Sequence, residues 1–313
     1  MNILLSTDNN YVMPTGVLMH SIGLHNARVN YYVLVNPDFL PESRNALVEI
    51  TKQYSSTINF YTIDNGLTKD LPIGKGNMPK HVSLATYYRL FLTKVLPDNV
   101  HKILYLDGDM IVRKNISDLW NVDLKGKAIG VVHDMDEKRH ADLKRLSYPM
   151  GTGYFNAGMM LINLDYWREH HCLEQFVKFI NNHGHEILYH DQDVLNSVLY
   201  NQRVWVPITY NFQSGFLYKR ENKDYPIELE EEVEVSRRDA AIVHFSTPIK
   251  PWMLDSFQPY TAAWRYYKAK SQWKSLKLLG DNPKGLKEYV RNFLVRHNIW
   301  NIPSEYIRFT IRK

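Results

Sequence analysis

The chain is poor in several features that mark particular classes of protein. Its 313 residues include one cysteine, Cys172, which excludes an internal disulfide and a cysteine-based metal site and fits a reducing compartment. No apolar run approaches the roughly 18–20 residues that cross a bilayer. The segment Met1–Asp8 also lacks the basic and apolar regions of a signal peptide. We therefore expect a cytoplasmic protein, either soluble or peripheral on the inner face of the cell membrane.

Glycine-rich phosphate-binding motifs are missing as well. The chain contains neither G-x-G-x-x-G nor G-x-x-x-x-G-K-[S/T]. This excludes the dinucleotide-binding fingerprint and the P-loop in their usual forms. A nucleotide bound by this protein must therefore be held by other residues.

The composition is that of a folded chain with unevenly placed charge. Apolar residues make up 44% and aromatic residues 13%, enough for a sizeable core. The overall net charge is +5, but from Arg265 onward twelve Lys and Arg residues face three acidic ones, a net charge of +9. The preceding residues therefore carry −4, and the basic character belongs to a C-terminal segment.

Short apolar runs alternate with helix-like segments in the first half of the chain. The runs predict buried strands at Ile3–Ser6, Tyr31–Val35, Ile58–Ile63, Lys102–Leu106 and Ala128–Val132. Apolar spacings of three and four predict helices at Pro41–Tyr54 and Ser83–Leu96. This alternation predicts an α/β fold with a Rossmann-like, doubly wound, mostly parallel sheet, in which ligands bind beyond the carboxyl ends of the strands.

The second half is less regular, and its end differs in composition. We expect strands at Gly158–Asn163 and Ala240–Phe245, helices at Tyr166–Asn181 and Asp191–Tyr200, and a solvated loop at Glu228–Asp239. Near Gln258 the pattern changes to aromatic and basic residues at helical spacing. We therefore predict a catalytic domain over residues 1–257 and a basic, helical appendage over residues 258–313.

Two carboxylates follow the strand expected at Lys102–Leu106. Asp107 and Asp109 would lie at the carboxyl edge of the sheet, with Gly108 allowing a tight turn between them. Converging carboxylates suit Mn²⁺ or Mg²⁺ and repel each other without a cation. The motif predicts a metal site, although Asp-x-Asp also recurs by chance in ordinary turns.

A histidine stands near the end of the strand expected at Ala240–Phe245, and a lysine follows six residues later. The His244 imidazole can complete a metal site begun by carboxylates, and Lys250 can approach a diphosphate as a point charge. Pro248 and Pro251 make the loop that ends at Trp252 stiff rather than flexible. Taken alone, His244 is more typical of a structural histidine in a turn.

Three further groups of polar residues stand next to expected strands or helices. After the first strand, Asp8 and Asn10 offer hydrogen-bonding groups for a base or ribose, and Tyr11 offers a stacking face. Asn156 and Asp191 precede apolar segments, where polar groups can hold sugar hydroxyls. Asp8, Asn10 and Asp191 are equally typical of helix N-caps.

Together these segments resemble glycosyltransferase family 8, the retaining family that includes glycogenin and bacterial lipopolysaccharide galactosyl- and glucosyltransferases. The resemblance runs from Met1 to about Trp252 and rests on Asp8-Asn9-Asn10-Tyr11, Tyr105-Leu106-Asp107-Gly108-Asp109, Tyr154-Phe155-Asn156-Ala157-Gly158, Asp191-Gln192-Asp193 and the stretch from His244 to Lys250-Pro251-Trp252. It implies a GT-A type fold. It also implies transfer of glucose or galactose from a UDP-sugar to a glycan or glycolipid acceptor, in cell-surface polysaccharide or lipopolysaccharide synthesis.

The resemblance also implies roles for single residues. The metal, Mn²⁺ with Mg²⁺ as the alternative, would be held by Asp107, Asp109 and His244. Asp8, Asn10 and Tyr11 would contact the uridine of the donor, and Gly108 would contact the donor beside the metal. Arg89, which ends the similar stretch His81–Arg89, would bind the sugar or the diphosphate. Asp134 and Asn156 would contact the sugar, and Lys250 would bind the diphosphate. Asp191 and Gln192 would lie beside the anomeric carbon as the catalytic pair.

One departure from the family pattern concerns the diphosphate loop. Thr247 stands where the family often has glycine, so the backbone conformation of this loop is in question. Retention can arise from a covalent double displacement or from same-face attack guided by the leaving phosphate. Because the amide of Gln192 is a poor nucleophile, we favour same-face attack, and the sequence leaves both mechanisms open.

The C-terminal segment Pro283–Trp300 has the pattern of a basic amphipathic helix. Its apolar stripe comprises Leu286, Tyr289, Val290, Phe293, Leu294 and Trp300, with Lys284, Lys287, Arg291 and Arg296 on or beside the polar face. Such helices lie on anionic membrane surfaces, which is the partner that we expect. The alternative is that the stripe packs on the catalytic domain. We expect no nucleic-acid partner.

Two other functions compete with glycosyl transfer. A sugar nucleotidyltransferase also uses a metal on a related sheet, but it would need a glycine-rich basic loop after the first strand. A non-catalytic nucleotide-sugar-binding protein would be expected to have lost part of the set Asp107, Asp109, His244 and Gln192, which is intact.

Overall fold

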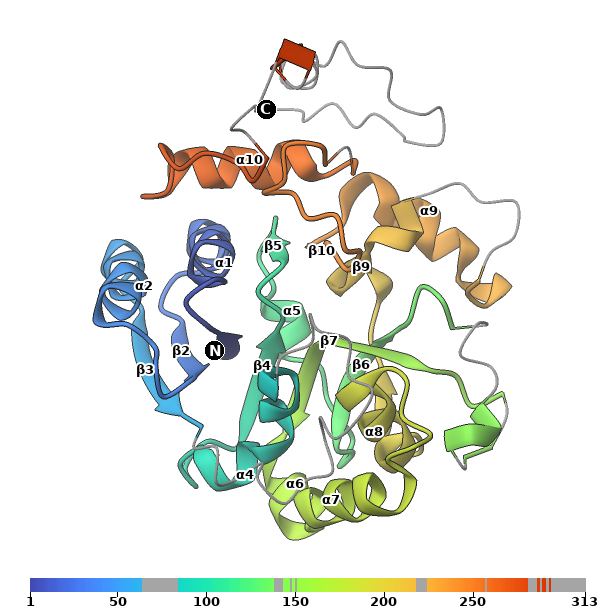
Figure 1. Ribbon diagram of the computed structural model, residues 1–313. Coiled ribbons are helices and arrows are strands. Elements are labelled where there is room, and N and C mark those ends of the chain that lie inside the picture. Colours follow the sequence, from blue (N-terminus) through green and yellow to red (C-terminus); the bar gives the residue numbers. More distant parts are fainter. Residues whose placement is uncertain are drawn as a thin grey trace.

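The computed structural model describes residues 1–63, 84–137, 143–146, 148–149, 151–217, 224–256, 258–280, 286–287, 289–290 and 293. They form a central seven-stranded sheet and a smaller three-stranded sheet, with helices on both sides of the larger one (Figure 1). The helices are α1 (Val12–His25), α2 (Pro41–Gln53), α4 (Leu92–Val95), α5 (Ser117–Trp120), α6 (Leu164–Glu169), α7 (Cys172–His183), α8 (His190–Leu199), α9 (Glu230–Asp239) and α10 (Thr261–Lys270).

The central sheet is mostly parallel, as the sequence predicts. Its strands, in spatial order, are β3 (Thr57–Thr62), β2 (Asn30–Val35), β1 (Asn2–Thr7), β4 (Lys102–Leu106), β7 (Phe155–Asn163), β6 (Ile129–His133) and β8 (Arg203–Trp205). All neighbouring pairs are parallel except the two that involve β7, which runs antiparallel to β4 and β6. The doubly wound α/β architecture is therefore confirmed.

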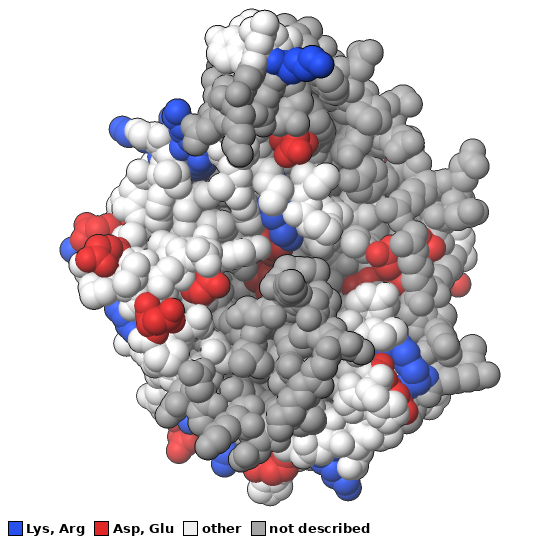
Figure 2. All heavy atoms as spheres, in the orientation of Figure 1, with Lys and Arg blue, Asp and Glu red and all other residues white. Residues whose placement is uncertain are grey.

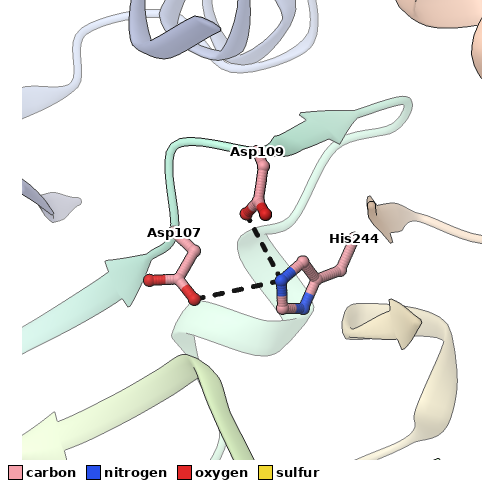
Figure 3. Close-up of side chains that lie close together, drawn as sticks. All are labelled: Asp107, Asp109 and His244. Atoms are coloured by element: carbon pink, nitrogen blue, oxygen red, sulfur yellow. Dashed lines mark ion pairs between the residues drawn. The ribbon is translucent and has the colours of Figure 1, made fainter. Parts of the chain in front are cut away.

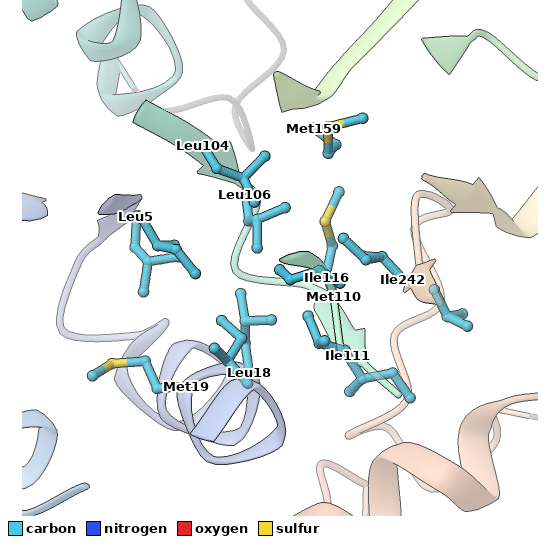
Figure 4. Packing of buried hydrophobic residues seen from close by; sticks show 14 of the residues in the cluster. Leu5, Leu18, Met19, Leu104, Leu106, Met110, Ile111, Ile116, Met159 and Ile242 are labelled. Atoms are coloured by element: carbon cyan, nitrogen blue, oxygen red, sulfur yellow. The ribbon is translucent and has the colours of Figure 1, made fainter. Parts of the chain in front are cut away.

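Successive residues of the central strands point into different cores. Ile3 and Leu5 of β1 belong to the core that contains α1, whereas Leu4 belongs to the core that contains α7 and α8. In the first core, Leu18 and Met19 of α1 share one cluster with Leu5 and Leu104 of the central sheet and Ile111 of the smaller sheet (Figure 4). Because both faces are covered, the strands read as continuous apolar runs rather than as alternating ones.

The predicted bounds of the strands agree with the observed bounds within one or two residues, except at β7. β4 has the predicted bounds, whereas β7 begins at Phe155, three residues before the predicted Gly158. Eight of its nine residues are buried, including the polar Asn156. A polar residue in a strand is tolerated here because its side chain is hydrogen-bonded within the protein.

The predicted loop at Glu228–Asp239 is wrong, because most of it forms helix α9. Glu230, Glu231 and Glu232 occupy its first turn and Arg237 and Arg238 its last turn. This order of charges complements the helix dipole and stabilises a helix whose composition is otherwise strongly polar. Val233, fully buried, anchors the helix to the core.

Two predicted helices differ in form. The segment Tyr166–Asn181 is divided into α6 and α7 by His171, which has a φ of 50°. The described part of Ser83–Leu96 is a 3₁₀ helix, Leu84–Phe91, followed by the short α4, and Ser83 lies outside the described residues. Helix α1 was not predicted because it is buried on nearly every side and therefore has no amphipathic stripe.

The smaller sheet holds the segment that follows Asp109. Its strands are β5 (Met110–Val112), β10 (Ile242–His244) and β9 (Phe212–Gln213), with β10 in the middle. β5 and β10 are antiparallel, and their register places His244 opposite Met110. The loop from β4 to β5 therefore passes from one sheet to the other beside His244.

The first part of the predicted appendage packs on the body of the protein. In α10, Trp264 is fully buried within the same core as α1, and Tyr267 hydrogen-bonds His25 of α1 through its hydroxyl at 3.1 Å. The ring of Trp273 packs against Gly16. The boundary near residue 258 stays a prediction, and this packing favours Gly280 as the junction of any removable segment.

Charge does not mark a binding surface on the face seen in Figure 2. Among the residues coloured there, Lys, Arg, Asp and Glu lie in small, separate groups rather than in one patch of a single sign. In the described part of the chain, no helix has the length and apolar character needed to cross a bilayer.

Replacing Trp264 tests whether α10 belongs to the folded body. We expect Trp264→Ala to lower the free energy of unfolding by about 3–5 kcal/mol, because a large buried ring leaves a cavity. Tyr266→Ala is the matched control on the same helix, since Tyr266 is 53% exposed and its loss should change stability by about 0.5 kcal/mol. Urea denaturation measures both, and equal effects would contradict the packing described here.

Candidate active site

Two carboxylates and one imidazole converge at the junction of the two sheets. Asp107 and Asp109 come from the loop between β4 and β5, and His244 comes from the end of β10 (Figure 3). His244 Nε2 lies 3.3 Å from Asp109 Oδ1 and 3.9 Å from Asp107 Oδ2. One potential ligand atom from each residue lies within 4.8 Å of the others.

This donor set fits a divalent metal ion. Asp109 and His244 are buried, while Asp107 keeps 26% of its side chain exposed, so the cluster is open on one side. Carboxylate oxygens and a neutral imidazole are both ligands for Mn²⁺, whereas Mg²⁺ prefers the carboxylate oxygens. The three residues expected to bind metal are thus brought together.

Close packing explains Gly108 between the carboxylates. A Cβ at this position would lie 3.0 Å from Thr15 Oγ1 and 3.4 Å from Tyr11 Cδ1. Gly108 is not among the described glycines with positive φ, so the expected need for a special turn conformation is not the reason. The small residue instead lets the loop approach the start of α1. Its contact with the donor stays a prediction.

The environment of Asp109 keeps this carboxyl ionised. Burial raises its pKa, but the charge of Lys250 and the contacts with His244 outweigh burial and hold the pKa well below its usual range. Lys250 Nζ lies 2.6 Å from Asp109 Oδ2 and donates to the backbone oxygen of Phe245 at 2.7 Å. Lys250, predicted to bind diphosphate, thus lies directly beside the metal cluster.

Arg89 links the metal cluster to the predicted catalytic residue Asp191. Its guanidinium is 3.2 Å from Asp107 Oδ1 and 3.0 Å from Asp191 Oδ2, and it donates to the backbone oxygen of Ala157 at 2.9 Å. Burial raises the pKa of Asp191 to about 7, although the neighbouring Arg89 lowers it. The cation therefore compensates only part of the free energy lost by burying this carboxylate.

Gln192, Asp134 and Asn156 form a hydrogen-bonded group at the end of β6. Asn156 Nδ2 donates to Asp134 Oδ2 at 3.0 Å, and Gln192 Nε2 donates to the same oxygen at 3.2 Å. Gln192 Oε1 accepts from the backbone N–H of Ala157 at 2.9 Å. Asn156 and Asp134 are buried. Contact of these residues with a sugar stays a prediction.

The residues expected at uridine lie at the start of α1. Asp8 Oδ1 accepts from the backbone N–H groups of Asn10 and Tyr11, both at 2.9 Å, so this carboxylate shapes the turn before the helix. Asn10 is exposed. The ring of Tyr11 meets Trp252 edge to face, with centroids 5.5 Å apart. Burial and the charges of Asp109 and Asp107 raise the pKa of Tyr11.

Thr247 does not impose an unusual backbone on the loop after β10. The described non-glycine residues with positive φ are Arg28, Ser55, Lys125, His171 and His190. Thr247 therefore adopts a conformation that any residue allows, and its hydroxyl donates to the backbone oxygen of Ile249 at 3.3 Å. Glycine is not needed there for conformational reasons.

Asn211 is a residue of the site that the sequence did not indicate. It is fully buried, and its Oδ1 lies 3.0 Å from His244 Nδ1. A single asparagine before a short strand carries no recognisable spacing, so no pattern marks it. Gly158 leaves room for the same ring, because an added Cβ would overlap His244 and lie 2.8 Å from its Nδ1.

The comparisons with known proteins agree with the resemblance seen in the sequence. A model of glycosyl transferase family 8 matches residues 2–255. The chain is 27% identical over 281 residues to General stress protein A of Bacillus subtilis, covering 88% of this chain and 96% of that protein. It is 26% identical over 310 residues to lipopolysaccharide 1,2-glucosyltransferase of Escherichia coli, covering 95% and 86%.

A solved structure shares the fold. Galactosyltransferase LgtC, solved with donor and acceptor sugar analogues, superposes with a TM-score of 0.77 at 24% identity, covering 87% of this chain and 96% of that one. At this identity the likeness concerns the fold alone, and it agrees with the GT-A architecture inferred from the sequence.

Proposed function

The chain belongs to glycosyl transferase family 8, and from this premise we propose that it moves a hexose from a UDP-sugar to a glycan or glycolipid acceptor, with retention of the donor's anomeric configuration. The observation that carries the proposal is the cluster of Asp107, Asp109 and His244 at the carboxyl edge of β4, with Lys250 beside it. Such a cluster suits a diphosphate that must leave with negative charge.

The residues of the cluster would have different roles when the diphosphate leaves. Asp107, Asp109 and His244 would hold Mn²⁺, with Mg²⁺ as the alternative, and a bound divalent ion supplies Lewis-acid neutralisation of the diphosphate charge. Lys250, whose ammonium lies 2.6 Å from Asp109 Oδ2, adds a second positive charge on the same side. Tyr11, Asp8 and Asn10 would contact the uridine, at the start of α1.

The contacts of Gln192 favour same-face attack over a covalent intermediate. Its amide oxygen is neutral and accepts hydrogen bonds from Ala157 N–H and Asn156 Nδ2, at 2.9 and 3.3 Å. An oxygen engaged in this way is a weak nucleophile. Gln192 and Asp191 would instead position the donor sugar and stabilise charge at its anomeric carbon, with Arg89, Asp134 and Asn156 holding them and the donor in place.

The relatives support a hexose donor but not one particular hexose. One relative is named a lipopolysaccharide glucosyltransferase and one solved structure a galactosyltransferase. We therefore propose glucose or galactose as the transferred sugar, and cell-surface polysaccharide or lipopolysaccharide synthesis as the setting. A screen of UDP-sugar hydrolysis across donors identifies the sugar.

We also propose that the segment after Gly280 binds an anionic membrane surface. Four members of its predicted apolar stripe are described, and all are exposed: Leu286 by 79%, Tyr289 by 59%, Val290 by 45% and Phe293 by 48%. The remaining members, Leu294 and Trp300, lie outside the described residues. Exposed apolar side chains next to basic ones suit the boundary between lipid headgroups and acyl chains.

Removal of the metal tests the proposed chemistry. Chelation by EDTA should abolish sugar transfer, and Mn²⁺ should restore it. Asp109→Asn should lower the rate by more than about 100-fold, because this side chain would hold the ion in both the ground and transition states. Release of UDP with and without acceptor measures turnover. Full activity in EDTA would refute the proposal.

The configuration of the product tests the retaining assignment. From an α-linked UDP-hexose we expect an α-linked product, because attack on the face from which the diphosphate leaves preserves the anomeric centre. The coupling constant of the new anomeric proton in NMR distinguishes the two outcomes, and a β-linked product would show that the enzyme inverts.

Charge reversal tests membrane binding. Lys287→Glu combined with Arg291→Glu should weaken binding to anionic vesicles, since each basic residue near the surface contributes about 1 kcal/mol. Binding of the unaltered protein should fall as salt rises. The matched control is Lys94→Glu with Lys178→Glu, because these exposed lysines lie on α4 and α7, on the opposite side of the molecule from α10 (Figure 1).

Truncation after Gly280 completes that test. It keeps Trp264 and Trp273 on the body, so UDP-sugar hydrolysis should persist while vesicle binding is lost. A truncated protein that melts far earlier, together with a full-length protein indifferent to anionic vesicles, would favour packing of the segment on the body instead.

A further inference from the structure

Asn211 lies between the candidate metal site and the residues around Gln192. It follows a short 3₁₀ helix, Ile208–Tyr210, and directly precedes β9. Its Oδ1 lies 3.0 Å from His244 Nδ1, and its Nδ2 donates to Asn156 Oδ1 at 2.9 Å. The side chain is fully buried, so protein groups rather than solvent decide how it is oriented.

Groups that only donate or only accept determine the orientation of Asn156. Its Oδ1 accepts from the backbone N–H of Gly158 at 3.0 Å, and a backbone N–H can only donate. Its Nδ2 lies 3.0 Å from Asp134 Oδ2, a carboxylate oxygen that accepts. The hydrogen bonds at both ends of the Asn156 amide therefore require the same orientation, in which its oxygen faces Asn211.

The orientation of Asn156 in turn determines that of Asn211. Only the Nδ2 end of Asn211 can donate to Asn156 Oδ1, so its oxygen must face His244. A carboxamide oxygen accepts and never donates, which requires His244 Nδ1 to carry the proton. His244 Nε2, 3.3 Å from Asp109 Oδ1, is then the ring nitrogen that is left to bind a metal.

We propose that Asn211 is a positioning residue that holds His244 in the Nδ1–H tautomer, ready to bind a divalent metal through Nε2, and that it joins this ligand to Gln192 through Asn156. Asn156 Nδ2 lies 3.3 Å from Gln192 Oε1. The same chain of amides thus orders the metal ligand and the residue proposed beside the anomeric carbon. Outer hydrogen-bond partners of this kind orient metal-binding histidines in general.

The metal part of this inference rests on the proposed function, but the hydrogen bond from His244 Nδ1 to Asn211 Oδ1 is a property of the metal-free protein. A purely structural role for Asn211 would predict lower stability on substitution without a change in the state of His244. Asn26 provides the comparison: it is also buried, and its amide bonds Ile22, Lys114 and Ile116, away from the site.

Nitrogen NMR of the metal-free protein tests the proton on Nδ1 directly. With ¹⁵N-labelled histidine, the His244 signal, identified by its loss in His244→Gln, should show a protonated Nδ1. In Asn211→Leu, which removes the acceptor, the form with its proton on Nε2 alone should gain population, whereas Asn26→Leu should leave the signal unchanged. A native His244 without a proton on Nδ1 would overturn the proposal, whatever the protein binds.

The affinity for Mn²⁺ in the absence of donor sugar tests the consequence for metal binding, and the EPR signal of the free ion measures it. Asn211→Leu should weaken binding about 10–100-fold, while Asn26→Leu should change it by less than about threefold. Asn211→Asp keeps an acceptor for His244 but cannot donate to Asn156. It should restore most of the Mn²⁺ affinity while leaving the rate of sugar transfer low.

The outcomes separate this inference from the proposed function. If the unaltered protein binds no Mn²⁺, the proposed function fails, and the NMR measurement still decides the role of Asn211. If the unaltered protein binds Mn²⁺ and a folded Asn211→Leu binds it equally well, the role of Asn211 is refuted and the metal site stands. Circular dichroism establishes folding, and the ¹⁵N signal of His244 in the unaltered protein decides the proposal if Asn211→Leu does not fold.

Discussion

The repulsion between Asp107 and Asp109 is the constraint around which the site is built. Two carboxylates within reach of one ion destabilise the fold unless positive charge or hydrogen bonds compensate them. Lys250 contacts Asp109 at 2.6 Å, Arg89 contacts Asp107 at 3.2 Å, and Tyr105 donates to Asp107 at 2.6 Å. Lys250 and Arg89 come from other segments of the chain, so it is the folded structure that brings positive charge to the two carboxylates. A divalent cation would add to the same compensation.

The junction of the two sheets supplies the geometry that this chemistry needs. β4 ends at Leu106 and β5 begins at Met110, so the loop between them is short and anchored at both ends by buried residues. The antiparallel pairing of β5 with β10 brings His244 to the same point. Because all three ligands are attached to strands, they are held in place more rigidly than residues on a free loop.

The sequence predicted what depends on local pattern and missed what depends on tertiary contacts. β4 and its two carboxylates were found because a buried strand ending in Asp-Gly-Asp is a local signal. α9 was missed because its composition is strongly polar and its anchoring by Val233 is visible only after folding, and α1 because a helix buried all round has no stripe. The resemblance to a family supplied His244, whereas Asn211, which orients it, has neither a pattern nor a motif. The residues proposed to bind the metal could thus be named from the sequence, whereas the residue proposed to orient His244 could not.

The central claim is that Asp107, Asp109 and His244 together bind the ion that neutralises the leaving diphosphate. Pulsed EPR of Mn²⁺ bound to the protein with UDP tests it most directly. The account predicts hyperfine coupling to one histidine nitrogen, which changes on ¹⁵N-histidine labelling and disappears in His244→Ala, and coupling to diphosphate phosphorus in the same complex. Mn²⁺ bound with UDP but without any histidine nitrogen coupling would contradict it.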